Sequence, residues 1–351
     1  MKRSASMKSI LYFRIFSLIF LITATTSTAQ ELTAHPNIPR IDVHSHIGQD
    51  EQGIANYLLV RERLKELHNV DLAMWINLGN GKTPFPDQDL VLKAGQGRIL
   101  SCISDYSSHD GFDIDPGELK SWMQKGYVGY KIWAGPPHRR LKEGEEGYPY
   151  IDHPALDPTF AAMEKIGMVA ASIHIADPNG PWGKRTKWLP DPVEYWKEIL
   201  AFRHVLERHP DLTFIVAHCM WAICQDAQID YLRNVLGTFP NVHVDLAATF
   251  QYFDLVTREN LRSFMIEYAD RILFGADIGR WSDPAQNENY AKRYFRCFQI
   301  LETDQTINGS FFGDAPIEGL ALPEDVLEKI YFKNAMRLYP AVAEQMKSIT
   351  R

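Results

Sequence analysis

Two histidines lie two residues apart in the short stretch RIDVHSHIG, residues 40–48. Side chains alternate along a β-strand, so we expect Asp42, His44 and His46 to leave one side of the strand together. Neutral imidazole is a common ligand of zinc and similar divalent ions, and two imidazoles on one strand supply half of a tetrahedral site. Seen alone, the pair is also compatible with two ordinary polar residues at a strand end.

Further polar side chains occur singly inside apolar runs, near the ends of predicted strands. A single buried histidine is usually explained by a backbone partner, but a buried lysine or aspartate is rare without one, because removing a charge from water is costly. With the first pair they make six residues at the ends of five strands, and together they predict one metal site. They are Lys131 in VGYKIW, His174 in AASIHIADP, His218 in FIVAHC and Asp277 in ILFGADIG.

Eight apolar, β-branched runs recur along the chain with helical patterns between them. The runs cover residues 41–47, 70–78, 98–106, 127–133, 168–176, 212–220, 241–249 and 271–279. Strand and helix alternating in this way predict an α/β fold with parallel strands, most simply a closed (β/α)8 TIM barrel, with an open doubly wound sheet as the alternative. No glycine-rich phosphate loop follows the first run, which disfavours nucleotide binding. In a barrel the carboxyl ends of the strands converge, which would bring the six polar residues together.

The helical patterns between the runs also carry start signals. Asp157 precedes Pro158, which predicts a helix capped by the aspartate. The segment after Pro192 is amphipathic, and its apolar face would hold Tyr195, Ile199, Phe202 and Leu206.

With these residues in place, the chain resembles the amidohydrolase superfamily, specifically its amidohydrolase-related (amidohydrolase 2) branch. The resemblance covers residues 38–340 and is supported by HIADP, ERHPDLTFIVAH, FPNVHVDLAA, DRILFGAD, YFRCFQILETD and IYFKNAMRLYP. It implies a metal-dependent hydrolase with one or two divalent ions, zinc before manganese or a similar metal. It also implies that His44, His46 and Asp277 hold the first ion and that His174 is a further ligand. By the same resemblance, His218 would bind a second ion or polarise the substrate oxygen.

Lys131 is a departure from many single-metal members of this branch, which have no lysine at the end of the fourth strand. In two-metal members that lysine is carboxylated and bridges the ions. Carboxylation requires a neutral amine, which burial near cations favours by lowering the lysine pKa. We favour the two-metal site; the alternative, an unmodified Lys131 that binds a substrate carboxylate or phosphate, stays open.

The resemblance further implies a reaction. A metal-activated water would be the nucleophile, Asp277 would take its proton as general base, and the metal with His218 would stabilise the oxyanion. We expect hydrolysis of an ester, lactone or amide bond in a small anionic substrate. Decarboxylation of an aromatic or unsaturated carboxylic acid is the alternative, favoured by one ion and an unmodified Lys131. A catalytically silent binding protein is disfavoured by the intact ligand set.

Residues outside the ligand set carry weaker predictions. Asp42 and Asp245 are equally explained as residues that orient ligands and as structural hydrogen-bond acceptors. Aromatic and basic residues at strand ends and in the following loops suit a flat or sugar-like substrate with a carboxylate, although each basic residue is equally explained as a solvated loop charge. The candidates for substrate binding are Trp133, Arg139, Arg140, Trp188, Trp221, Arg280 and Trp281.

The first 29 residues differ in composition from everything that follows. Basic residues precede a short apolar run at 15–22, and small residues lead up to Gln30, which is the pattern of a secretory signal peptide cut after Ala29. The apolar run is too short for a convincing membrane span. We therefore expect residues 1–29 to be a signal peptide, residues 30–351 to form one barrel domain, and the protein to be exported, to the periplasm or beyond.

Charge and cysteine content limit the partners. Without the first 29 residues the chain has 33 basic and 44 acidic residues, a net charge of −11, which disfavours nucleic acid. A small-molecule substrate is expected, stable membrane insertion is not, and a homo-oligomer is left open. Four cysteines are too few for a disulfide scaffold, but Cys219 and Cys224 could pair in an oxidising compartment.

Overall fold

The computed structural model describes residues 35–48, 50–81, 85, 87–134, 149–180, 192–309 and 315–349. Two compact units divide the chain, Met1–Glu31 and Leu32–Arg351, and every described residue belongs to the second. The expected signal peptide lies outside the described residues. The same holds for three of the substrate-binding candidates, Arg139, Arg140 and Trp188.

Parallel strands follow one another in chain order through two sheets, β1-β2-β3 and β4-β5-β6-β7-β8-β9. A separate antiparallel pair is formed by β10 (Thr306–Ile307) and β11 (Ile317–Glu318). The bounds of the parallel strands are β1 Arg40–Ser45, β2 Leu72–Asn77, β3 Ile99–Ser101, β4 Ile103–Tyr106, β5 Gly129–Trp133, β6 Val169–Ile173, β7 Phe214–Val216, β8 Val242–Asp245 and β9 Ile272–Leu273.

The two parallel sheets close into one barrel. β3 and β4 are halves of a single strand with only Cys102 between them, and the Cys102 N–H donates to the Asn77 carbonyl of β2 at 2.8 Å. At the second seam, the segment after β9 pairs with β1, where the Asp277 N–H donates to the His44 carbonyl at 2.8 Å. Each of the eight predicted runs therefore contains a barrel strand, and the (β/α)8 prediction is confirmed.

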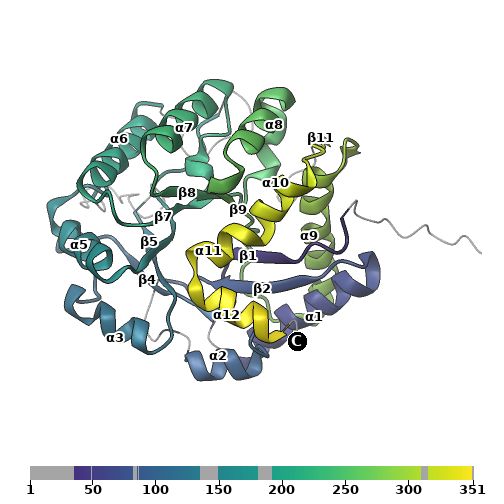
Figure 1. Ribbon diagram of the computed structural model, residues 1–351, viewed down its shortest axis with the longest axis horizontal. Coiled ribbons are helices and arrows are strands. Elements are labelled where there is room, and N and C mark those ends of the chain that lie inside the picture. The colour runs from purple at the N-terminus through teal and green to yellow at the C-terminus, as the bar shows by residue number, and fades with distance from the viewer. Residues whose placement is uncertain are drawn as a thin grey trace, which may run out of the picture. The chain divides into compact units, whose positions relative to one another are not determined.

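Helices surround the strands, as Figure 1 shows. Their bounds are α1 Glu51–His68, α2 Gln88–Ala94, α3 Leu119–Gln124, α5 Asp157–Ile166, α6 Pro192–Arg208, α7 Asp226–Thr238, α8 Arg258–Glu267 and α9 Asn287–Glu302. The predicted apolar face of α6 is confirmed, because Tyr195, Ile199, Phe202 and Leu206 are all at most 1 % exposed. No described helix is both long enough and apolar enough to cross a membrane.

The predicted cap of α5 is wrong by one residue. A 3-10 turn at Pro154–Leu156 leads straight into the helix, so Leu156 occupies the N-cap position and Asp157 is the first helical residue. The Asp157 carboxylate instead pairs with the Arg208 guanidinium of α6 at 2.8 Å. The aspartate therefore ties two neighbouring helices together and does not cap its own.

Three C-terminal helices close one end of the barrel: α10 (Glu324–Glu328), α11 (Asn334–Leu338) and α12 (Pro340–Ile349). Val342 and Met346 of α12 belong to the same apolar cluster as Ile41 and Met74 of the first two strands. Since Ile41 lies near the start of β1, this cluster fills the amino-terminal end of the barrel. The carboxyl ends of the strands are left for a functional site, as in other barrels of this type.

All four cysteines lie in the described part of the chain and are buried, and none of them forms a disulfide: Cys102, Cys219, Cys224 and Cys297. The disulfide between Cys219 and Cys224 that the sequence left open is therefore absent from the structure. Burial raises the pKa of the Cys102 thiol well above its usual value, so this thiol stays protonated and unreactive. These residues act as small apolar core side chains.

Candidate metal centre

Side chains from several strands meet at the carboxyl end of the barrel. The Nε2 atoms of His44 and His46 lie 3.6 Å and 3.3 Å from Asp277 Oδ1. We call these three residues the first subsite. His174 Nδ1 and His218 Nε2 lie 3.2 Å apart and form what we call the second subsite. The two subsites adjoin, because the rings of His44 and His218 have centroids 4.8 Å apart.

Backbone carbonyls fix the proton on two of these histidines. His46 Nδ1 donates to the Gly79 carbonyl at 2.7 Å, and His218 Nδ1 donates to the Ala247 carbonyl at 2.8 Å. A carbonyl oxygen can only accept, and a neutral imidazole has one N–H, so Nε2 of each ring keeps its lone pair. Both lone pairs face the other candidate ligands.

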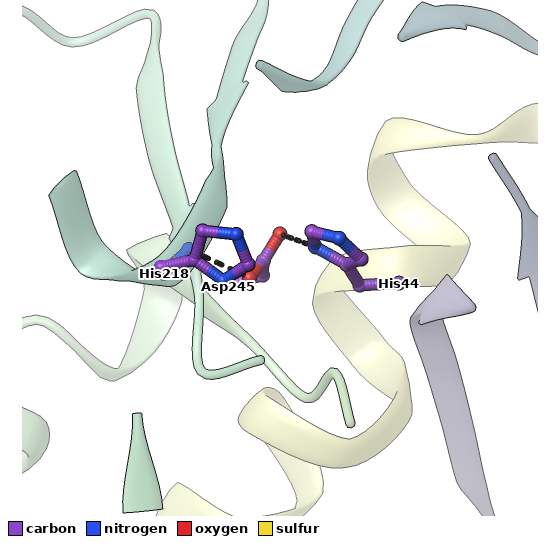
Figure 2. A group of neighbouring side chains, drawn as sticks. All are labelled: His44, His218 and Asp245. Carbon is purple, nitrogen blue, oxygen red and sulfur yellow. Dashed lines mark hydrogen bonds and ion pairs between the residues drawn. The ribbon is translucent and has the colours of Figure 1, made fainter. Parts of the chain in front are cut away.

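Carboxylates hold the other two histidines in the same way. His44 Nδ1 donates to Asp245 Oδ2 at 2.9 Å, as Figure 2 shows. His174 is held through its other nitrogen, since Nε2 donates to Asp177 Oδ1 at 3.1 Å. Metal-binding histidines are generally held by an acceptor on the nitrogen that points away from the ion. All four rings therefore present a lone pair to the shared centre.

The spacing of these atoms fits divalent ions. Two ligand atoms bound to one ion at about 2.0–2.1 Å with a tetrahedral angle lie about 3.3 Å apart. The His46–Asp277 distance is 3.3 Å and the His174–His218 distance is 3.2 Å. In the second subsite two lone pairs face each other with no hydrogen between them, an arrangement that a cation stabilises. His44, His46 and Asp277 thus fit a divalent metal, and the His174–His218 pair offers two further ligand atoms at a spacing that one ion accepts.

Charge states agree with the roles of ligands. Burial lowers the pKa of His44 and lowers that of His218 well below its ordinary value, so both rings are neutral. Burial acts to raise the pKa of Asp277, but the surrounding histidines, His46 first, then His44 and His218, outweigh it and hold the pKa well below its usual range. The site therefore contains neutral imidazoles and an ionised carboxylate, the forms that bind metals.

Lys131 lies fully buried on β5 beside the same residues. Its Nζ donates to the Ser172 carbonyl and lies 5.0 Å from the ring centre of Trp133. Burial lowers the pKa of Lys131 to about 8, although the charges of Asp245 and Asp277 act to raise it. The structure therefore brings the sixth predicted residue to the centre as an amine with reduced basicity.

Left-handed backbone positions two of the candidate ligands. His218 and the next three residues, up to Trp221, have φ between 51° and 59°, and Asp277 has φ 55°. None of these residues is a glycine, so each costs roughly 1–2 kcal/mol of backbone strain. Strain of this kind persists where the surrounding structure enforces it, and it is concentrated in functional sites.

Asp245 holds residues of both subsites at once. Its Oδ2 accepts a hydrogen bond from His44 Nδ1, and its Oδ1 accepts one from the backbone N–H of His218 at 3.0 Å. Figure 2 shows the carboxylate between the two rings. Ligand atoms of His44, His218 and Asp245 also lie within 4.8 Å of one another, so this group itself could contribute to a metal site.

Asp42 does not share one side of β1 with the histidines, contrary to the expectation from strict alternation. Its Oδ2 accepts the Tyr294 hydroxyl of α9 at 2.6 Å, and its Oδ1 accepts the His44 N–H at 2.8 Å. The register of β1 is irregular between Asp42 and Ser45, which turns His44 toward Asp277 while the aspartate faces a helix. Asp42 therefore supports the backbone beneath the first subsite.

Two of the aromatic candidates stack on ligands. Trp133 lies against the ring of His46 with centroids 5.8 Å apart, and Trp221 lies against His218 at 4.4 Å. The two tryptophan residues are only 9 % and 6 % exposed. They therefore brace one histidine in each subsite and offer only an edge to a substrate.

The last two candidates lie in the segment after Asp277. Arg280 is 58 % exposed in its side chain and pairs with Asp50. A Cβ on Gly48 would come within 2.9 Å of Arg280 Cδ, so the arginine passes closely over this glycine near His46. Trp281 is buried between α1 and α9 and donates from Nε1 to Asn287 at 2.7 Å, so it anchors the segment.

Sequence reasoning missed two residues that shape the centre. Asp177 accepts from His174, and its signal was a carboxylate three residues beyond a strand-end histidine in HIADP. Gly275 lies against His44, because a Cβ there would come within 2.9 Å of the His44 Cβ. Its signal was a glycine inside the strand pattern ILFGAD, which often marks a close approach of backbone.

Comparisons with known proteins agree with this architecture. Residues 117–341 match the Amidohydrolase family, and the chain belongs to it as an enzyme of the metal-dependent hydrolase type. Among curated proteins none matches.

Solved structures give the fold. An uncharacterized TIM-barrel protein from Bordetella bronchiseptica is similar with a TM-score of 0.50 and 15 % identity, over 87 % of this chain and 99 % of that one. The dihydroorotase of Saccharomyces cerevisiae, solved in complex with 5-fluoroorotic acid, is similar with a TM-score of 0.50 and 14 % identity, over 86 % and 84 %. At these identities the likeness establishes the TIM-barrel fold alone.

Proposed function

We propose that this protein is an exported hydrolase that uses two divalent ions, zinc before manganese or a similar metal, to cleave an ester, lactone or amide bond in a small anionic substrate. The observation that carries the proposal is the proton arrangement of the four histidines. Each ring donates outward to a carbonyl or carboxylate, which leaves four nitrogen lone pairs and Asp277 around one centre. Neutral imidazole and carboxylate suit divalent ions of the zinc type.

The two-ion form is favoured over the one-ion form by the geometry of His218. In a single-ion enzyme this residue would donate a hydrogen bond from Nε2 to the substrate oxygen. Its only N–H as a neutral ring is on Nδ1, where it donates to the Ala247 carbonyl. Its Nε2 can therefore accept a metal but cannot donate, and the same is true of His174 Nδ1 opposite it.

Lys131 would complete a two-ion site if carboxylated, because the added group would supply an anionic oxygen to both ions. Complete burial and a location beside Asp245 and Asp277 support this assignment. An unmodified amine that contacts a substrate carboxylate is the alternative. It would go with a single ion and would favour decarboxylation of an aromatic or unsaturated acid.

A divalent ion held by these residues would lower the pKa of bound water toward neutrality. Asp277 lies at the first subsite with its carboxylate ionised, so it can accept a proton from that water and return it to the leaving group. Trp133 and Trp221 hold the ligand rings and exclude water from their outer faces. Arg280, exposed beside Gly48, is a cation near His46 that would attract an anionic substrate.

Export is proposed from the composition of residues 1–29 alone. Expression with this segment in a bacterial host, followed by N-terminal sequencing of the mature protein, tests it. We expect the mature chain to begin at Gln30 and to be found in the periplasmic or secreted fraction. An uncut chain in the cytoplasm would contradict the proposal.

The reaction is tested by assaying metal-loaded and chelator-treated protein on a panel of lactones, esters, amides and aromatic acids. We expect hydrolysis of at least one anionic ester, lactone or amide by the loaded protein and none after chelation. Release of carbon dioxide from an acid, with no hydrolysis, would replace this function with the decarboxylase alternative.

A further inference from the structure

We propose that Asp177 is a positioning residue that keeps the second subsite open by fixing the tautomer of His174. The inference rests on the proposed function, because it assumes that the second subsite binds a metal. Asp177 lies in the segment that follows β6, three residues beyond His174, and is 2 % exposed. Its Oδ1 accepts the Nε2–H of His174 at 3.1 Å.

The bonding of Asp177 is unlike that of a carboxylate with a structural role. Its second oxygen, Oδ2, is buried and has no hydrogen-bond partner among the described residues. Asp105, a buried carboxylate at another strand end, accepts instead from two backbone N–H groups and from the Tyr130 hydroxyl. A buried carboxylate oxygen without a partner is costly. Among the described residues, the hydrogen bond from His174 is therefore the interaction that explains the buried position of Asp177.

His174 has two possible tautomers with opposite consequences. With the proton on Nε2, the ring donates to Asp177 and the Nδ1 lone pair faces His218. With the proton on Nδ1, the ring would donate to His218 Nε2, which lies 3.2 Å away. That bond would occupy the ligand atoms of both histidines and close the second subsite to a metal.

The carboxylate decides between these tautomers. A hydrogen bond to an ionised acceptor is roughly twice as strong as one between neutral groups, so the bond to Asp177 prevails over the bond to His218. The negative charge behind the ring also raises the basicity of the ligating nitrogen. Removing the charge should therefore favour the closed pair and weaken metal binding at the second subsite.

The first readout uses metal-free protein and is independent of metal binding. Long-range ¹H–¹⁵N spectra of imidazole rings distinguish the two tautomers, and His174→Gln identifies the signal. We expect the Nε2–H form in the wild type and a shift toward the Nδ1–H form in Asp177→Ala. Asp177→Asn keeps an acceptor oxygen without the charge and should lie between them. An unchanged tautomer in Asp177→Ala would overturn the inference.

The second readout is the binding of Co²⁺ as the only metal. Equilibrium dialysis and the visible absorption of bound Co²⁺ measure it. We expect the wild type to bind two equivalents of Co²⁺. In Asp177→Ala we expect the affinity for the second ion to fall by about 10–100-fold and the affinity for the first to stay unchanged. Asp105→Asn is the matched control and should bind both ions normally, because Asp105 accepts from none of the four histidines. Thermal unfolding of each variant checks that it is folded, and Asp177→Asn replaces Asp177→Ala if the latter is not.

The outcomes separate the two proposals. If the affinities for both ions fall equally, or if the affinity for the second ion does not fall, the proposed role of Asp177 is overturned. A wild-type protein that binds one Co²⁺ ion or none would contradict the two-ion function. In that case a tautomer shift in Asp177→Ala would still support the positioning of His174.

Discussion

His44 donates from Nδ1 to Asp245 Oδ2 across 2.9 Å, and both side chains are completely or almost completely buried. The same carboxylate accepts the backbone N–H of His218 at 3.0 Å. Burial would raise the pKa of Asp245, but its interactions with His44 and His218 outweigh burial and hold the pKa well below its usual range. One ionised group thus sets the proton on one candidate ligand, His44, and holds the backbone of another, His218.

Replacing Asp245 should therefore weaken both subsites. In Asp245→Asn a single amide oxygen must serve three N–H donors, His44 Nδ1 and the backbone N–H groups of His218 and Ala247, so His44 loses its fixed tautomer. We expect the affinity for the first ion to fall by about 10–100-fold and stability to fall by about 1–3 kcal/mol. Co²⁺ titration and denaturant unfolding measure the two effects. Unchanged affinity for both ions would show that Asp245 is only structural.

His46→Ala and Asp277→Asn should both abolish turnover, for different reasons. His46→Ala removes a neutral ligand of the first subsite, so it should lose metal. Asp277→Asn keeps an oxygen that can bind the ion but loses the base, so metal content should fall less than activity, by about 10²–10⁴-fold in kcat. Metal analysis and kcat on one substrate separate the two. Near-normal turnover in Asp277→Asn would rule out this base.

Lys131→Ala distinguishes a bridging ligand from a substrate contact. If Lys131 is carboxylated, the variant should hold well below two ions, and acetate or propionate should partly restore activity by occupying the vacated position. If the amine is free and contacts substrate, the ions should stay and KM should rise with kcat nearly unchanged. Metal content with and without propionate decides between them.

Gly275→Ala should disturb the first subsite through packing alone. The new Cβ would lie 2.9 Å from the His44 Cβ and 3.2 Å from the Ala247 Cβ, so the strand has to shift. Overpacking of this kind costs about 1–3 kcal/mol. Gly279→Ala is the matched control four residues later, because a Cβ there meets nothing within 4 Å. Equal stability and metal affinity in the two variants would refute the close packing inferred for Gly275.

The sequence predicts the barrel and the convergence of the candidate ligands because both depend on local patterns. Hydrophobic runs mark the strands, and the convergence of their carboxyl ends follows from the topology. His44, His46, His174, His218 and Asp277 accordingly meet in the structure.

Other features depend on contacts that no local pattern records. Strict alternation fails at Asp42 because β1 is irregular in register and Tyr294, 252 residues away, captures the carboxylate. The left-handed turn from His218 to Trp221 contains no glycine, so the sequence does not predict it. Trp281 follows a strand as a rim residue would, yet packing between α1 and α9 buries it. The protons on the histidines are likewise set by partners distant in sequence.

The direct test of the metal centre is elemental analysis of the mature wild-type protein, purified without chelator. We predict about two equivalents of divalent metal per chain, zinc before manganese, because two subsites each offer ligand atoms at the spacing that such ions need. Less than about a tenth of an equivalent, in protein that stays inactive when zinc, manganese or cobalt is added, would contradict a metal-dependent function for this site.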